Sequence, residues 1–336
     1  MGIDLPVIWA LIIAFSLAMY VVMDGFDLGI GLLFPLVSPG EDRDAMMNTV
    51  APVWDGNETW LVMGGAGLLA AFPLAYAVVL PALYFPLLIM LAGLILRGVA
   101  FEFRFKADEA HRPIWDKAFA GGSYAATYCQ GVALGAFIDG FRVEDGAFAG
   151  GPLDWLTPFS LFTGFGLLAA YALLGCTWLI MKTIGDLHAR MVRLARPLAL
   201  ILLGAIGAVS LWTPLAHPAI ADRWFSLPNL LYFAPVPLLV LAATWALLRA
   251  LQAATPNAAP FLLTLGLLFL GYSGLAISLW PNIVPPDISI REAAGPPESL
   301  GFTLVGALLI IPVILVYTAW AYWVFRGKVK AGEHYH

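Results

Sequence analysis

The sequence is short of charge. Only 12% of its 336 residues are Asp, Glu, Lys or Arg, whereas 61% are hydrophobic. Soluble globular domains carry about 25% charged residues, so this composition excludes an ordinary soluble protein and indicates an integral membrane protein. The 17 Lys and Arg residues are scattered and form no basic face, which argues against nucleic-acid binding.

Cysteine is scarce as well. The sequence has two cysteines, Cys129 and Cys176, and both lie within apolar runs. A disulfide framework is therefore not expected, and no Cys/His cluster has the spacing of a metal site. No P-loop or GxGxxG motif occurs, and no nucleophile–base pair suggests itself.

Long apolar segments fill most of the chain. A membrane-spanning helix needs about 20 mostly apolar residues. By this measure the sequence predicts nine spans, at 6–36, 50–72, 75–103, 117–141, 156–182, 195–216, 225–249, 260–280 and 301–325. No loop is long enough for a separate domain. We therefore predict an all-α polytopic membrane protein with a single transmembrane domain over residues 1–336.

Positive charge is divided unevenly between the two sides of these spans. Of the 17 Lys and Arg residues, thirteen fall on the side of the C-terminus and three on the side of the N-terminus. The remaining one, Arg97, lies within the third span. Cytoplasmic loops carry the excess of Lys and Arg, so we predict an N-terminus outside the cell and a C-terminus in the cytoplasm.

Several acidic side chains lie inside apolar segments. Asp24 and Asp27 are in the first predicted span, and Asp55 and Glu58 are near the start of the second. A carboxylate at the bilayer centre costs about 2.5–3.5 kcal/mol on insertion scales, so such groups are functional candidates. The predicted orientation brings them to the depth of Arg97, in the cytoplasmic half of the membrane. This arrangement indicates a proton uptake route or a cation site.

Other interpretations of these charges compete with a functional one. Asp27 could pair with Arg97, and Asp55 could cap the second span through the free amides of its first turn. Glu102 is expected at the same depth. A proton- or cation-coupled secondary transporter is the rival function. Transporters usually have paired halves with interrupted helices, whereas these carboxylates crowd into the first third of the chain.

The histidines are informative because of where they lie. None is in the middle of a predicted span, where a membrane haem usually takes an axial ligand. We therefore expect this chain to bind neither a haem nor a metal. The five histidines are His111, His188, His217, His334 and His336.

Six motifs make the chain similar to a known family. In chain order they are VMDGFDLGIG, APVWDGNETWL, LRGVAFEFR, TIGDLHAR, LWPNIVPP and PVILVYTAWAYW. Together they resemble subunit II of cytochrome bd-type quinol oxidases, from the first predicted span to the last. The short segment between the sixth and seventh spans looks more like the cyanide-insensitive branch.

This resemblance implies a fold, partners and cofactors. The nine helices would form two four-helix bundles plus one peripheral helix, in a bacterial cytoplasmic (inner) membrane. The partner would be a subunit I that carries haem b, haem d or a third haem b, and the quinol site. The complex would oxidise quinol and reduce O₂ to water. A small single-helix accessory subunit and a structural quinone are compatible with the resemblance.

The same resemblance implies roles for individual residues. Asp24, Asp27 and Asp55 match acidic positions of the family, with Asp55 the expected proton carrier. Glu58 stands where some relatives carry glutamine. Trp60 matches a tryptophan expected to line the oxygen access route. The expected proton path thus consists of Asp55, Glu58, Asp24, Asp27 and Arg97.

Overall fold

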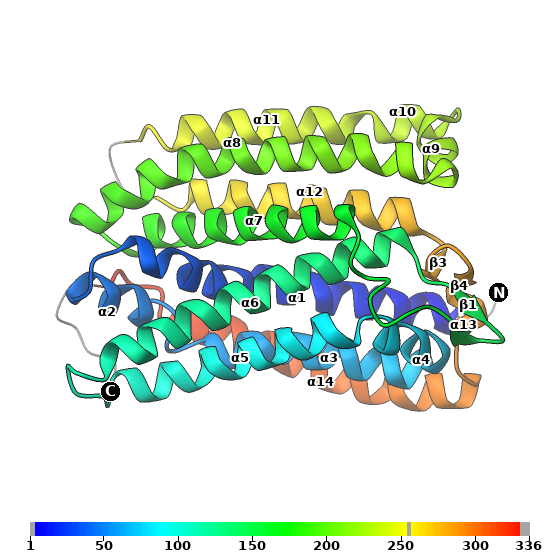
Figure 1. Ribbon diagram of the computed structural model, residues 1–336, viewed down its shortest axis with the longest axis horizontal. Helices are drawn as coiled ribbons and strands as arrows, with labels where there is room; N and C mark the ends of the chain where they lie inside the picture. The colour runs from blue at the N-terminus through cyan, green and yellow to red at the C-terminus, as the bar shows by residue number, and fades with distance from the viewer. Residues whose placement is uncertain (1–3, 254–256, 330–336) are drawn as a thin grey trace.

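The computed structural model describes residues 4–253 and 257–329, and most of them are helical (Figure 1). Each of the nine predicted spans overlaps a long helix. These helices are α1 (Leu5–Leu33), α3 (Trp54–Ala71), α5 (Tyr84–Arg104), α6 (Arg112–Asp139), α7 (Pro158–Lys182), α8 (Gly185–Ala216), α11 (Pro235–Ala250), α12 (Ala259–Leu279) and α14 (Pro297–Val324).

Short elements join the long helices at both ends of the molecule. The short helices are η1 (Phe34–Leu36), α2 (Glu41–Asn48), α4 (Pro73–Ala82), α9 (Pro218–Phe225), α10 (Asn229–Phe233) and α13 (Ile290–Ala293). Two antiparallel strand pairs complete the connections. They are β1 (Val143–Glu144) with β2 (Ala147–Phe148), and β3 (Asn282–Val284) with β4 (Ile288–Ser289).

Within the described ranges, seven helices are long and apolar enough to cross a membrane. The other two long helices, α3 and α6, do not meet this criterion because they are too polar, not because they are too short. The first turns of α3 hold Asp55, Asn57 and Glu58, while α6 is rich in glycine, alanine and polar residues. The chain is an integral membrane protein. The polar residues of α3 and α6 must be shielded from lipid by neighbouring helices.

The third predicted span, 75–103, is not one helix. It is divided into α4 and α5, with the break at Leu83. Proline explains the position of the break, because Pro86 has no amide hydrogen to donate to the carbonyl of Ala82, four residues earlier. The chain therefore turns at this point and starts a new helix at Tyr84.

The long helices lie side by side in two groups (Figure 1). In one group, α7, α8, α11 and α12 pack around a common centre, each against its neighbours. In the other, α6 packs against α5 and α1, and α1 packs against α3. Contacts of α1 and α6 with α7 join the groups, and α14 lies against α3 and α1 at the edge of the second. Helix α1 is thus the central element of the molecule.

Glycine pairs allow the central helices to approach closely. A Cβ atom at Gly29 of α1 would lie 1.9 Å from the carbonyl oxygen of Tyr171 in α7, and one at Gly175 would lie 2.5 Å from the carbonyl carbon of Gly29. Between α5 and α6, a Cβ at Gly122 would lie 2.4 Å from the oxygen of Gly93. Membrane helices commonly associate through small residues in this way. The resulting close packing holds α1, α5 and α6 in a fixed arrangement around the buried charges.

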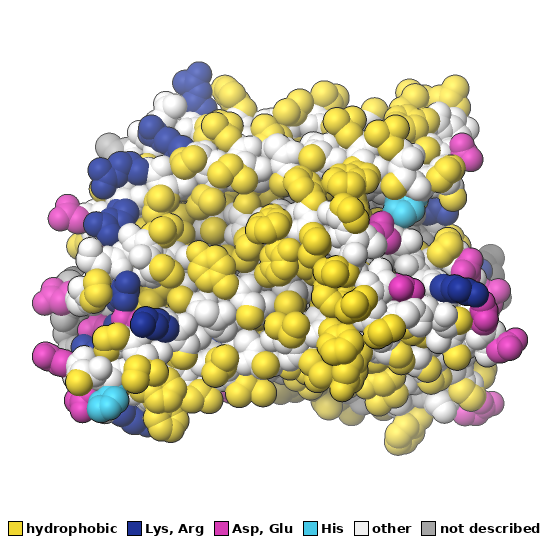
Figure 2. Space-filling model, viewed as in Figure 1, with side chains coloured by type: hydrophobic (Ala, Val, Ile, Leu, Met, Phe, Trp, Pro, Cys, Tyr) yellow, Lys and Arg dark blue, Asp and Glu magenta, His cyan; other side chains and the backbone are white. Residues whose placement is uncertain are grey.

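The surface is banded (Figure 2). Hydrophobic side chains cover the middle of the visible face, and charged side chains gather at the two ends. Most of the visible Lys and Arg side chains lie at the end where α2 and the α5–α6 connection are found. This is the surface expected of a protein whose middle faces lipid.

Candidate functional site

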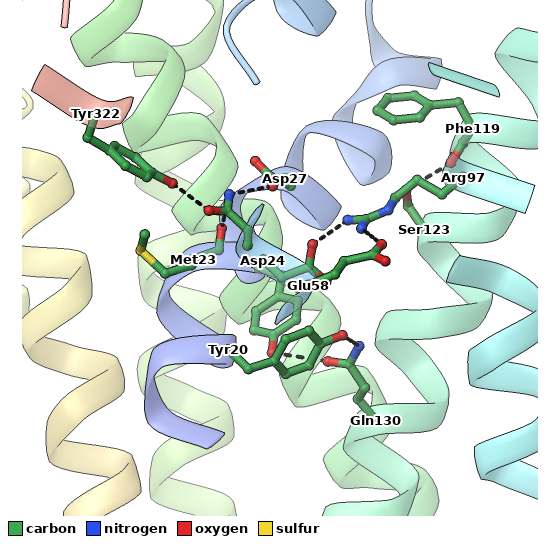
Figure 3. Close-up of polar contacts among 12 residues, drawn as sticks. Tyr20, Met23, Asp24, Asp27, Glu58, Arg97, Phe119, Ser123, Gln130 and Tyr322 are labelled. Carbon is green, nitrogen blue, oxygen red and sulfur yellow. Dashed lines mark hydrogen bonds and ion pairs between the residues drawn. The ribbon is translucent and has the colours of Figure 1, made fainter. Parts of the chain in front are cut away.

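Three ionisable side chains are completely buried where α1 and α5 face each other. Asp24 and Asp27 of α1 and Arg97 of α5 each have 0% of their surface exposed. Helix α3 brings Asn57 and Glu58 to the same place (Figure 3). The structure therefore brings together four of the five residues predicted for the proton path, namely Asp24, Asp27, Glu58 and Arg97.

Arg97 links the carboxyl groups of two helices. Its Nη1 donates to Oδ1 of Asp24 at 2.6 Å, and its Nη2 donates to Oε1 of Glu58. The expectation that Asp27 pairs with Arg97 is wrong. Residues three apart on a helix point in directions about 60° apart around its axis, so Asp24 can face α5 while Asp27 faces α3.

Asp27 is held by an amide instead of a guanidinium. Asn57 Nδ2 donates to Oδ2 of Asp27 at 2.7 Å and to the carbonyl oxygen of Met23 at 3.2 Å. The hydroxyl of Tyr322 in α14 donates to Oδ1 of Asn57 at 3.0 Å. Because the Met23 carbonyl can only accept, it fixes the amide with its NH₂ group toward Asp27.

Tyr322 also anchors the otherwise exposed helix α14. Its ring packs edge-on against Phe26, at 6.4 Å between centroids, and against Trp178, at 6.1 Å. The sequence analysis did not single out Tyr322 or Asn57. Asn57 stands within the polar stretch that drew attention to Asp55 and Glu58, whereas an aromatic residue near the end of an apolar helix gives no signal of such a contact.

Three atoms of the cluster are buried without a hydrogen-bond partner among the described residues. They are Oδ2 of Asp24, Oδ1 of Asp27 and Nε of Arg97. Counted as ionised groups, three carboxylates would face one guanidinium. Uncompensated charge in a protein interior is costly, so this excess of acidic groups distinguishes the cluster from an ordinary buried ion pair.

Exposure increases along α3 away from the buried cluster. The Glu58 side chain is 27% exposed although it is bonded to Arg97. Asp55, one turn earlier on the same helix, is exposed and forms no hydrogen bond or ion pair with another described residue. The N-cap position of α3 is Val53, with no side-chain cap, so the expectation that Asp55 caps this helix is not met.

Glu102 does not join the cluster. Its side chain is 62% exposed and lies 3.5 Å from Lys106, one turn later on α5. Its side chain therefore points away from Arg97, and the expectation that the two residues lie at a similar depth stays a prediction. Arg97 and Glu102 are five residues apart, so they point to opposite sides of α5.

A chain of three polar side chains lies beyond Asp24, on the side of the N-terminus of α1. Gln130 Nε2 donates to the hydroxyl of Tyr20 at 2.7 Å, and the Tyr171 hydroxyl donates to Oε1 of Gln130 at 3.1 Å. Tyr20 is one turn before Asp24, so the two side chains share a face of α1. The polar residues thus continue from α3 across α1 to α6 and α7 (Figure 3).

Trp60 is fully buried within this chain. Its ring meets the edge of Phe15 at 5.6 Å between centroids, and it packs with Tyr20 and Met23. Its Nε1 has no hydrogen-bond partner among the residues that the structure describes. Trp60 therefore packs beside the polar cluster, against side chains of α1. Its role in oxygen access stays a prediction.

The three described histidines lie at or near helix ends, and each has a polar group close to one of its ring nitrogens. His111 Nδ1 is 2.6 Å from Oδ1 of Asp108, and this hydrogen bond lowers the pKa of the exposed Asp108 carboxyl. His188 Nδ1 is 3.1 Å from the carbonyl oxygen of Ile180, and His217 Nε2 is 3.3 Å from Oδ1 of Asp139. The remaining two, His334 and His336, lie outside the described residues. The three described histidines thus lie away from the middle of the long helices, where a membrane haem usually takes an axial ligand. That the haems belong to the partner stays a prediction.

Residues 4–253 and 257–329 contain no group of three or more His, Cys, Asp or Glu side chains that could hold a metal ion. The buried charges are carboxyl groups tied to an arginine and an amide. An arginine is always a donor and cannot ligate a metal.

The fold and the cluster together define a mainly helical membrane protein with a buried acid–arginine site. The solved structure of bd oxidase from Geobacillus thermodenitrificans contains a chain of the same fold. It superimposes with a TM-score of 0.74 at 17% identity, over 94% of this chain and 98% of that chain.

Sequence comparison identifies the family. The model for cytochrome bd terminal oxidase subunit II matches residues 5–325. Cytochrome bd-I ubiquinol oxidase subunit 2 of Escherichia coli (strain K12) is 30% identical, over 96% of this chain and 94% of the relative. Cytochrome bd ubiquinol oxidase subunit 2 of Bacillus subtilis (strain 168) is 27% identical, over 97% of both. The chain belongs to the cytochrome bd terminal oxidase subunit II family, and the prediction of a quinol oxidase subunit is confirmed.

Proposed function

We propose that this chain supports a haem-bearing subunit I and delivers protons from the cytoplasm toward the site where that subunit reduces O₂. Membership of the family implies haems in the complex. The partner is the better place for haem b and haem d, or a third haem b, because the described histidines of this chain lie away from the middle of the long helices. Quinol oxidation would belong to the partner as well.

This division of labour can be tested by spectroscopy. The subunit expressed alone should show no Soret band, whereas the co-purified oxidase should show one. Single replacement of His111, His188, His217, His334 and His336 should leave the haem content of the oxidase unchanged. Stoichiometric loss of haem in any one variant would show that this chain supplies a haem ligand.

The orientation is part of the proposal, with nine crossings in a bacterial cytoplasmic membrane. The charge bias of the loops supports an outer N-terminus, and so does the gathering of Lys and Arg at one end of the molecule (Figure 2). Cysteine-accessibility labelling should find 104–116 and 183–194 on the cytoplasmic side and 142–155 outside. Protection of 142–155 from an external reagent would reverse the orientation and remove the proton route.

The proposed proton route rests on one observation: side-chain exposure decreases from Asp55 on α3 to the buried cluster. Asp55 is exposed, Glu58 is partly exposed, and Asp24 is buried, and Arg97 bonds to both Glu58 and Asp24. Arg97 remains protonated, so it holds the two carboxyl groups in place and does not itself carry the proton. In this route Asp55 takes up a proton near the membrane surface, Glu58 receives it, and Asp24 and Asp27 hold it at their free oxygens.

Replacement of Asp55 by asparagine tests the route at its exposed end. Asp55→Asn keeps the shape of the side chain but cannot release a proton. The assembled oxidase should keep its haem spectrum, lose much of its quinol oxidase turnover, and take up protons more slowly in single-turnover experiments. Glu102→Gln is the matched control, because Glu102 is an exposed carboxylate of α5 outside the cluster. Normal turnover of Asp55→Asn would place proton uptake elsewhere.

We also propose that Trp60 forms part of a wall along which oxygen reaches the partner. Its burial among apolar and aromatic side chains supports this role, because oxygen is apolar. Trp60→Ala should then change the apparent affinity of the oxidase for O₂ more than its maximal turnover. A structural quinone and a small single-helix accessory subunit remain compatible with the exposed apolar surface of the chain.

A further inference from the structure

A second group of charges surrounds a pocket at the end of the molecule where α1 ends and α6 begins. The pocket has a volume of about 480 Å³. Apolar residues form part of its wall, among them Phe34, Pro35 and Ala120. Basic residues from three segments of the chain also line it, namely Arg43, Arg104, Arg112 and Lys117. We call it the α5–α6 pocket.

Two of these basic residues are fixed by carboxylates. Asp116 accepts from Arg43 at 2.6 Å and from Arg104 at 2.5 Å, and Asp44 accepts from Arg104 at 2.6 Å. The guanidinium groups of Arg43 and Arg104 also lie over the ring of Phe34, at 5.0 and 5.4 Å from its centroid. These contacts make a rigid base for the pocket.

The other two basic residues, Arg112 and Lys117, have N–H groups that form no hydrogen bond with the described residues. The nearest carboxyl oxygen to Arg112 is that of Asp44, at 3.8 Å, which is too far for a hydrogen bond. Its Nε is buried and has no hydrogen-bond partner among the described residues. Lys117 is exposed and forms no ion pair or hydrogen bond with any residue in the described part of the chain. Arg112 and Lys117 therefore present unused donors to the pocket.

The charge of the pocket is unbalanced in favour of an anion. Its four basic residues face three carboxylates, those of Asp44, Asp116 and Glu109. One positive charge is therefore in excess, and a phosphodiester supplies one negative charge. Arginine is well suited to this group, because its planar fork can donate two parallel hydrogen bonds to phosphate oxygens.

The surroundings of the pocket favour a lipid over a free anion. Leu36 and Ile114, each next to a proline of the pocket wall, are 56% and 58% exposed. Apolar surface of this kind beside charged residues marks the boundary between lipid tails and headgroups. Basic pockets between membrane helices are known to bind lipid headgroups. We propose that the α5–α6 pocket binds the phosphodiester headgroup of an anionic phospholipid through Arg112 and Lys117.

Native mass spectrometry of the complete oxidase tests this site, and the test does not depend on the proton route. The detergent-purified oxidase is incubated with phosphatidylglycerol, phosphatidylcholine or inorganic phosphate. The unmodified oxidase should retain phosphatidylglycerol at one site in preference to phosphatidylcholine. The double variant Arg112→Gln with Lys117→Gln should bind phosphatidylglycerol at least tenfold more weakly. Arg112→Lys keeps the positive charge but loses the two parallel N–H donors of arginine. Its affinity for phosphatidylglycerol should lie between those of the unmodified oxidase and the double variant.

Lys106→Gln is the matched control, because Lys106 is an exposed basic residue of the same connection that does not line the pocket. It should bind phosphatidylglycerol as the unmodified oxidase does. Haem content and melting temperature verify that every variant is assembled. Equal retention of the two lipids, or unchanged binding by the double variant, would overturn the proposal. Displacement of the lipid by an equal concentration of inorganic phosphate would overturn the assignment to a lipid.

Discussion

Helix α5 contributes one arginine to each of two charged clusters, and the clusters are unbalanced in opposite directions. Arg97 lies in the buried cluster with the carboxyl groups of Asp24, Asp27 and Glu58. Arg104, two turns later, lies in the α5–α6 pocket, where four basic residues face three carboxylates. An excess of buried carboxyl groups favours the uptake of protons, whereas an excess of basic residues favours an anion. In the two proposals, arginines two turns apart on one helix therefore take part in different chemistry.

Aromatic residues separate the two clusters. Phe101, between Arg97 and Arg104 on α5, stacks on Trp54 at 5.1 Å and meets the edge of Phe119 at 5.0 Å. Phe119 in turn meets Phe34, the ring beneath the guanidinium groups of the pocket. A proton cannot hop along apolar rings, so the proposed proton route begins at Asp55 and Glu58 on α3 rather than at the pocket.

The largest predicted difference between the two clusters is in the stability lost when the arginine of each cluster is replaced. Arg97→Gln leaves Asp24 without a cation in a fully buried position, and breaking a buried ion pair in this way costs about 3–5 kcal/mol. Arg104→Gln should cost less, about 2 kcal/mol, because Asp116 keeps its bond to Arg43 and Asp44 stays near Arg112. Thermal unfolding and yield of the assembled oxidase measure the difference. Equal losses would mean that the two clusters are equivalent supports of the fold.

The second prediction separates activity from assembly. Asp24→Asn removes a proton-holding group, so the oxidase that assembles should turn over at least tenfold more slowly. Asp116→Asn weakens the bonds to Arg43 and Arg104, so it should lower the melting temperature but leave the turnover of each assembled oxidase unchanged. Turnover normalised to haem content distinguishes the two. A turnover loss in Asp116→Asn as large as in Asp24→Asn would contradict the division of roles.

Much of this fold could be predicted from the sequence because lipid imposes a simple pattern. Each predicted span overlaps a long helix, and the break between α4 and α5 falls where Pro81 and Pro86 stand. The grouping of Asp24, Glu58 and Arg97 could also be predicted, because their depth follows from their positions along the spans.

The partners within each cluster could not be predicted. Depth does not tell which way a side chain points around its helix, so Asp27 was expected at Arg97 but lies at Asn57. A local sequence pattern also does not indicate which residues far apart in the chain will contact each other. Tyr322 and Asn57 are 265 residues apart, and Arg43 and Asp116 are 73 apart. The α5–α6 pocket could not be predicted for the same reason, because its basic residues come from three separate helices and in the sequence look like ordinary solvated residues.

The smallest predicted effect concerns the attachment of α14 to the buried cluster. Tyr322→Phe removes the hydroxyl that donates to Asn57 and leaves the ring in contact with Phe26 and Trp178. Loss of one such hydrogen bond should cost about 1 kcal/mol of stability. Tyr317→Phe is the matched control, because Tyr317 is on the same helix and is 64% exposed. It should change the melting temperature of the oxidase very little.

A double-mutant cycle shows whether Tyr322 acts through Asn57. Asn57→Ala removes the amide that joins Asp27 to Tyr322, so the further change Tyr322→Phe should then cost almost nothing. The coupling energy between the two sites should be about 1 kcal/mol, the size typical of residues in direct contact. Both variants should also slow proton uptake, because Asn57→Ala removes the amide that holds Asp27, and Tyr322→Phe removes one of the two contacts, beside the Met23 carbonyl, that orient this amide. Additive losses in stability, with proton uptake unchanged in Tyr322→Phe, would mean that this tyrosine only packs α14 against the bundle.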